Sequence, residues 1–139
     1  MPRLTQWYLR SALLYLVLSL SVGFVLAGRT ILGLPPSLVR FQPVFFHLFV
    51  VGWLTQLIFG VVYWMFPKFS RENPYRSHKL AWTTFWLLNI GLLLRAFSEP
   101  TLGQGSGSAW SYLLVVSAGL QLIAGLSFLI NTWGRVKPR

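Results

Sequence analysis

The side chains with the most distinctive chemistry in this sequence are a few histidines, glutamates and arginines placed beside long apolar runs. His47 lies near the start of the run that ends at Pro67, and Arg40 precedes that run. Arg95 lies near the end of a later run, with Glu99 four residues further on. Neutral imidazole is a common metal ligand, and arginine pairs with carboxylates through two parallel hydrogen bonds. These residue types favour the binding of a metal-containing or anionic group.

Several kinds of active site are excluded by the residues that the chain lacks. It has no cysteine and no aspartate, and Glu72 and Glu99 are its only carboxylate side chains. Disulfides, thiolate-bound metal centres and covalent heme attachment through C-x-x-C-H all need cysteine. A Ser-His-Asp triad cannot be formed, and two glutamates so far apart are not expected to form an acid–base pair. Any chemistry would therefore come from a bound cofactor.

The composition indicates a membrane protein. Of the 139 residues, 55% are hydrophobic and only 10% are charged, whereas about 25% are charged in a typical soluble domain. The formal charge of +10 would suggest nucleic-acid binding in a soluble protein. Here the basic residues lie in short segments beside apolar runs, which indicates contact with membrane lipid headgroups. Because there is no basic stripe with interleaved exposed aromatics, we expect no nucleic-acid partner.

Four segments are long enough to cross a bilayer, which takes roughly 20 apolar residues. We predict an all-α integral membrane protein, with one four-helix transmembrane domain over residues 1–139 and helices at about 7–27, 43–66, 79–97 and 109–132. The first segment is expected to be retained rather than cleaved as a signal peptide, because its apolar stretch is long for that role. A Gly/Ser-rich linker at 103–108 separates the last two helices.

The basic residues predict the orientation of the bundle. Nine lie near the N-terminus, between the second and third helices, or near the C-terminus: Arg3, Arg10, Lys68, Arg71, Arg76, Lys79, Arg135, Lys137 and Arg139. The opposite side has three, Arg29, Arg40 and Arg95. By the positive-inside rule both termini should face the cytoplasm. The expected location is a cytoplasmic membrane of the bacterial or archaeal type.

The second helix is predicted to have two distinct faces. With a period of 3.6 residues, Gly52, Gln56, Gly60 and Tyr63 fall on one side, and such small and polar residues pack helices together in lipid. The other helices carry similar groups, namely Asn89, Gly91, Ser117, Gln121, Gly125 and Asn131. His47 falls on the opposite side of the second helix and heads an aliphatic stripe, which consists of Val51, Leu54, Ile58, Val62 and Met65.

Two interpretations of His47 remain open. It could be an interfacial histidine that hydrogen-bonds a neighbouring helix or water, or an axial ligand of a heme flanked by the aliphatic stripe. Arg95 and Arg40 would then bind the heme propionates. Glu99 or a lipid phosphate would serve Arg95 equally well. His78, in a basic loop, is expected to be solvated beside Ser77, which would cap the third helix.

The stretch from Phe45 to Pro100 resembles the catalytic subunits of heme–copper oxidases and nitric oxide reductases. The resemblance is carried by His47, by Gly52-Trp53, by the Gly60-x-x-Tyr63-x-x-x-Pro67 pattern and by the LAW…FWLLNIGLLLRAFSEP helix. It implies one of the three four-helix groups of that family, with a ligand-bearing second helix and outer-side arginines on heme propionates. His47 and Arg95 match these places.

The chain also departs from that family pattern. It offers one intramembrane histidine and lacks the acidic residues of the family's proton paths, so one copy is not expected to be a complete oxidase. The resemblance implies a heme b subunit of a respiratory electron-transfer system, as a homo-oligomer such as a trimer that rebuilds twelve helices. The alternative is a heme-free accessory subunit within a larger respiratory complex.

Overall fold

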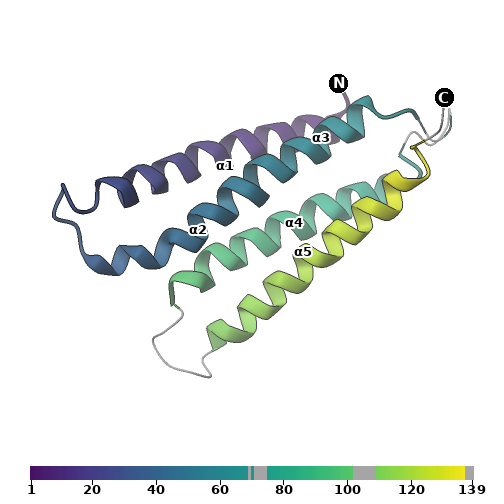
Figure 1. The fold of residues 1–139 in the computed structure, drawn as a ribbon. Coiled ribbons are helices and arrows are strands. Elements are labelled where there is room, and N and C mark those ends of the chain that lie inside the picture. The colour runs from purple at the N-terminus through teal and green to yellow at the C-terminus, as the bar shows by residue number, and fades with distance from the viewer. Residues whose placement is uncertain (69, 71–74, 102–108, 137–139) are drawn as a thin grey trace.

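The protein is a bundle of four long helices, joined in sequence as two antiparallel hairpins (Figure 1). The computed structural model describes residues 1–68, 70, 75–101 and 109–136. Within these residues, four helical segments are long and apolar enough to cross a membrane, as the sequence predicts. The first hairpin pairs α1 with α2 and α3, and the second pairs α4 with α5. α1 begins and α5 ends at the same end of the bundle (Figure 1).

α1 and α4 extend beyond the expected apolar runs, and the residues that they gain are mostly polar. α1 spans Arg3–Gly28 and α5 spans Ala109–Trp133. α4 spans His78–Ser98 and continues at its C-terminal end into one 3-10 turn, η3 (Glu99–Thr101). The expected N-cap of α4 is confirmed, since the Ser77 hydroxyl accepts a hydrogen bond from the Leu80 amide at 3.2 Å.

The second span is built from four consecutive helical pieces rather than from one regular helix. A 3-10 turn, η1 (Pro36–Phe41), leads into α2 (Gln42–His47). A π-helical segment, η2 (Leu48–Thr55), follows, and α3 (Gln56–Met65) completes the span. Pro43 lies in the first turn of α2, where a proline costs no hydrogen bond because the amides of that turn have no intrahelical acceptor.

The π-helical segment changes which way His47 faces. A π-helix closes its hydrogen bonds over five residues, so it contains more residues per turn than an α-helix. The regular period that placed His47 opposite Gly52 therefore does not hold between these two residues. The stripe is also divided, because Val51 packs against the core whereas Leu54 and Ile58 are exposed on the outer surface.

Glycines bring the helices of the first hairpin into close contact. A Cβ atom added at Gly52 would lie 2.8 Å from Cγ of Tyr15, and one added at Gly60 would lie 2.9 Å from Cβ of Tyr8. Both distances are shorter than van der Waals contact, so α1 could not approach this closely past any larger residue. The expected packing seam is therefore observed, with Gln56 and Tyr63 also buried along it.

A polar cluster joins three helices at mid-span. The Asn89 side-chain oxygen accepts hydrogen bonds from the Tyr15 hydroxyl at 3.0 Å and from the Gln56 amide at 3.1 Å. Asn89 in turn donates to the carbonyl of Phe85 at 2.8 Å. In hydrocarbon such groups are satisfied only by one another, so the cluster holds α1, α3 and α4 in register.

Two further polar contacts join α4 to α5. The Ser117 hydroxyl donates to the carbonyl of Gly91 at 2.6 Å, where the missing side chain of Gly91 lets the two helices touch. Near the other end, the Asn131 side chain accepts from the Ser77 amide and donates to the Ser77 carbonyl, both at 3.1 Å. These residues confirm the expected interhelical role of the polar stripe, except that Gly125 faces open space.

Arg135 closes the end of the bundle where the chain begins. Its guanidinium donates to the carbonyls of Pro67, Phe66 and Tyr63 at 3.0, 2.9 and 3.4 Å, which are the unpaired acceptors at the C-terminus of α3. The side chain is 1% exposed and also lies over the ring of Tyr75. Burial lowers the pKa of Arg135 below its ordinary value, but a guanidinium still remains charged near neutral pH.

Some expectations fall on residues outside the described part of the chain. These are the basic residues Arg71, Lys137 and Arg139, together with Glu72 and the linker at 103–108.

Replacing Gly52 with alanine should destabilise the bundle by about 1–3 kcal/mol, because the new methyl group must displace Tyr15 or Leu92. The matched control is Gly119→Ala, since nothing lies within 4 Å of a Cβ atom at that helical glycine. Thermal unfolding in mild detergent, followed by circular dichroism, measures both. Equal midpoints for the two variants would contradict the close packing at Gly52.

Replacing Arg135 with glutamine should lower the unfolding midpoint, by the equivalent of at least about 2 kcal/mol, because helix-end carbonyls lose a charged donor. Arg10→Gln makes the same change of charge at an exposed position and should have little effect. Equal unfolding midpoints for Arg135→Gln and Arg10→Gln would contradict the capping role and leave Arg135 with a role in topology alone.

Candidate functional site

The candidate site is centred on Glu99, the one carboxylate within the described residues. Glu99 follows directly after α4 and is 7% exposed. Its Oε1 atom lies 2.8 Å from Nε of Arg95 and 3.2 Å from Nδ1 of His47. A buried carboxylate needs such partners because removing a charge from water is costly. Glu99 thereby links α2 to the end of α4.

These contacts fix the hydrogen on the imidazole ring of His47. Nδ1 lies 2.9 Å from the carbonyl oxygen of Pro43 and 3.2 Å from Glu99 Oε1. Carbonyl and carboxylate oxygens only accept hydrogen bonds, so Nδ1 carries the hydrogen. In the neutral ring Nε2 then carries the lone pair, and none of the described residues hydrogen-bonds to it. An imidazole held in this way through Nδ1 is arranged as ligating histidines are.

His47 and Arg40 line the same pocket. This pocket has a volume of about 570 Å³, and it is lined by three apolar residues, Val39, Pro43 and Phe46, and four polar or charged ones, Arg40, Gln42, His47 and Glu99. Most of its lining surface is nevertheless apolar. Ligand sites of small molecules and cofactors have volumes of about 300–1,000 Å³, with mostly apolar walls and few polar groups. The pocket therefore has the size and lining of a cofactor site that remains open on one side.

Arg95 occupies a different position from Arg40. Its Nε atom donates to Glu99, one helical turn further along, so the partner that the sequence offered within the same helix is present. Arg95 is not among the residues that line the pocket. It neutralises Glu99, and Glu99 orients His47, so Arg95 reaches the pocket through its neighbours.

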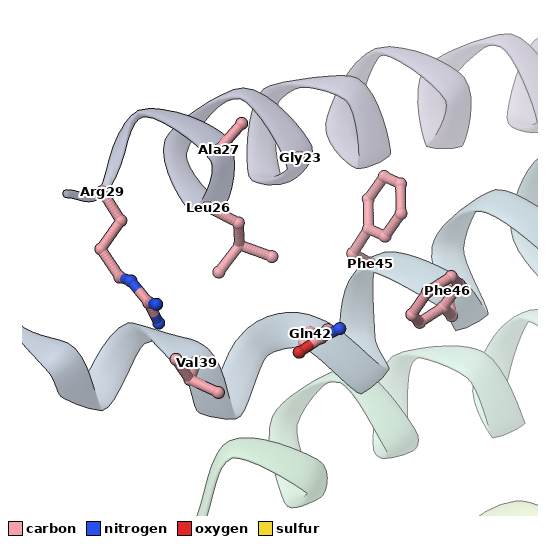
Figure 2. Close-up of a pocket in the computed structure, with 8 residues that line it drawn as sticks. All are labelled: Gly23, Leu26, Ala27, Arg29, Val39, Gln42, Phe45 and Phe46. Carbon is pink, nitrogen blue, oxygen red and sulfur yellow. The ribbon is translucent and has the colours of Figure 1, made fainter. Parts of the chain in front are cut away.

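A second pocket adjoins the first across Gln42 and Phe46. It has a volume of about 400 Å³ and lies between the end of α1 and the start of the second span (Figure 2). Arg29, which follows α1, is its only charged lining residue. The three arginines that the sequence assigned to one side of the membrane thus lie at one end of the bundle.

His78 lies at the start of α4, at the other end of that helix from Glu99. Its Nε2 atom accepts a hydrogen bond from the indole of Trp82 at 3.1 Å, and the residue is exposed. Its lone pair is therefore already used. His78 and His47 are not brought together.

Sequence reasoning missed two roles in this region. It paired Glu99 with Arg95 but not with His47, because a regular α-helical period turned His47 away from α4. The contact of Nδ1 with Pro43 arises within α2, whereas the side of the span on which His47 lies relative to Gly52 depends on the π-helical segment that begins at Leu48. The i, i+4 spacing of Pro43 and His47 was the available signal, since a histidine can donate back to the carbonyl one turn earlier.

The ion pair between Arg95 and Glu99 can be measured by a double-mutant cycle. Glu99→Gln and Arg95→Gln should each destabilise the bundle, and the double variant should lose less than the sum by about 1 kcal/mol. This value allows for the partial exposure of Arg95, at 21% of its side chain. Strictly additive unfolding midpoints would contradict the pairing.

The comparisons with known proteins agree with the resemblance that His47 and its helix indicate. The family model described as Cytochrome C and Quinol oxidase polypeptide I matches residues 5–134, which cover nearly all of the first apolar helix and the whole of the other three. No curated protein and no solved structure matches the chain significantly. The chain therefore belongs to the cytochrome c and quinol oxidase polypeptide I family, and it is an integral membrane protein of that family.

Proposed function

We propose that the protein is a b-type heme-binding subunit of a membrane electron-transfer system, with His47 as the axial ligand. The observation that carries the proposal is the arrangement of His47, whose Nδ1 atom is held by Pro43 and Glu99 while Nε2 is left free beside an apolar pocket. Members of the family typically bind hemes, which supply electron transfer or gas binding at iron.

The residues of the pocket fit such a group. A heme needs apolar walls, a ligand nitrogen and cations for its two propionates, and the pocket offers Phe46, His47 and Arg40 in these roles. Among the described residues, Arg40 has no carboxylate partner, so its guanidinium is available to an anion.

Arg95 would contribute in a different way from Arg40. Only its Nε atom is used by Glu99, so the other guanidinium nitrogens remain able to bind a propionate at the edge of the site. Its first effect is to hold Glu99 in place beside His47. A carboxylate that accepts from Nδ1 makes the opposite nitrogen a stronger electron donor.

The open side of the pocket favours an assembly of several chains. One chain provides a single wall and one described intramembrane histidine, so a second ligand or wall must come from elsewhere. A homo-oligomer, with a trimer as the form that rebuilds the family's twelve helices, would supply it. We place both termini on the cytoplasmic side of a bacterial or archaeal type of cytoplasmic membrane, on the basis of the basic residues.

A heme-free accessory subunit of a larger respiratory complex is the second candidate function. One specific observation favours it: Glu99 already satisfies both Arg95 and His47 without any cofactor. In that case His47, Arg95 and Glu99 would only stabilise the packing of α2 against α4. The pocket would be filled by lipid or by a partner subunit.

Absorption spectra of the purified protein decide between the two functions. Protein from heme-replete cells should show a b-type spectrum on reduction with dithionite, and His47→Gly should lose it because the axial nitrogen is gone. Added imidazole should restore the spectrum of His47→Gly. His78→Gly is the matched control and should keep the wild-type spectrum.

A colourless wild-type protein that copurifies with stoichiometric partners would support the accessory function. A coloured His47→Gly variant would place the ligand elsewhere. Native mass measurement in mild detergent tests the assembly, and a monomer as the sole species would count against the trimer.

A further inference from the structure

The pocket between the end of α1 and the start of the second span has the chemistry of an amphiphile site (Figure 2). Its walls are apolar and come from two helices of the bundle: Gly23, Leu26, Ala27, Val39, Phe45 and Phe46. The two polar lining groups are the guanidinium of Arg29 and the amide of Gln42. Figure 2 shows Leu26 and Phe45 projecting between the helices, while Arg29 reaches across from the end of α1 toward Val39.

Arg29 lacks a counter-ion within the described residues. The chain has two acidic residues; Glu99 is engaged by Arg95 and His47, and Glu72 belongs to the segment that joins α3 to α4. Neither the guanidinium of Arg29 nor the side-chain amide of Gln42 has a hydrogen-bond partner in the described part of the protein. A half-buried guanidinium beside apolar walls therefore favours an external anion.

The apolar part of the site continues beyond Arg29. Leu26 is shared with a smaller neighbouring pocket of about 150 Å³, whose lining is wholly apolar: Val22, Val25, Leu26, Leu38 and Phe41. At Gly23, an added Cβ atom would lie 2.9 Å from Cε2 of Phe45, so the ring of Phe45 closes the site toward the middle of the bundle. A free anion would leave these apolar surfaces uncovered, whereas an acyl chain would cover them.

We propose that this pocket is a specific binding site for an anionic phospholipid. The phosphate would bind the guanidinium of Arg29 and the amide of Gln42, and one acyl chain would lie over Leu26 toward Val22 and Val25. This site lies at the level where α1 ends, which is where a lipid headgroup is found beside a spanning helix. It adjoins the pocket of His47, with which it shares Val39, Gln42 and Phe46, but it requires no heme.

The test uses native mass spectrometry of protein made without added heme, in mild detergent. The probes are phosphatidylglycerol and phosphatidylcholine with identical acyl chains. The wild type should retain phosphatidylglycerol about tenfold better, the effect of one charge-assisted contact. Arg29→Gln should lose this preference, and Arg3→Gln, an equal charge change at an exposed position at the other end of α1, should keep it.

A second variant separates the apolar part of the site from its charge. Leu26→Trp fills the pocket and leaves Arg29 in place, so it should also reduce retention of phosphatidylglycerol. Equal retention of both lipids by the wild type would overturn the proposal, as would wild-type binding by Arg29→Gln. Displacement of the lipid by millimolar inorganic phosphate would likewise overturn it, because the site would then recognise a free anion.

Discussion

Helices in a bilayer gain little by burying apolar side chains against one another, because lipid tails are as apolar as leucine. The structure therefore depends on close contact and on polar groups that satisfy each other. Gly52 and Gly60 let α1 approach the second span, and Asn89 gathers Gln56 and Tyr15 at mid-span. Exposed leucines and phenylalanines on the outer faces make the bundle compatible with lipid, but they do little to determine which helices pack together.

The two ends of the bundle use their charges differently. At one end Arg135 is surrounded by carbonyl oxygens and aromatic rings, so its charge caps α3 and no ionisable partner is needed. At the other end Glu99 joins Arg95 and His47 across two helices. Arg29 lines a pocket without a carboxylate, and Arg40 lines a pocket whose carboxylate, Glu99, is already engaged by Arg95 and His47. This second end has cations beyond what its own acids neutralise, which is why both proposed ligands are amphiphiles with anionic groups.

The number of spanning helices could be predicted from the sequence, because it follows directly from the lengths of the apolar segments and from the polar residues, glycines and prolines that end them. The seam of Gly52, Gln56, Gly60 and Tyr63 could be predicted as well, since three of its four members follow the π-helical segment or lie within α3, where the period is regular. The contact between His47 and Glu99 could not, because a π-helix leaves no signal in the hydrophobic pattern. The role of Arg135 could not be predicted either. In the sequence it is one of the basic residues that indicate topology, and nothing in the pattern indicates its contact with the end of α3.

The family membership and the geometry of His47 support each other but rest on different observations. The family match covers the whole bundle and indicates a respiratory oxidase context. The geometry indicates that Nε2 of His47 is the nitrogen available to bind a ligand. Glu99 connects the two observations. It orients His47, and it is held by Arg95, the arginine that the resemblance associates with heme propionates.

The most direct test of this account is the tautomer of His47 in the heme-free protein, measured by nitrogen-15 NMR in detergent with histidine labelled on both ring nitrogens. A His78→Asn variant leaves one labelled histidine and makes the assignment unambiguous. The account predicts a neutral ring with hydrogen on Nδ1 and a bare Nε2, and Glu99→Leu should weaken that preference. A ring with its hydrogen on Nε2 would contradict the account, because the nitrogen proposed to bind iron would then be occupied.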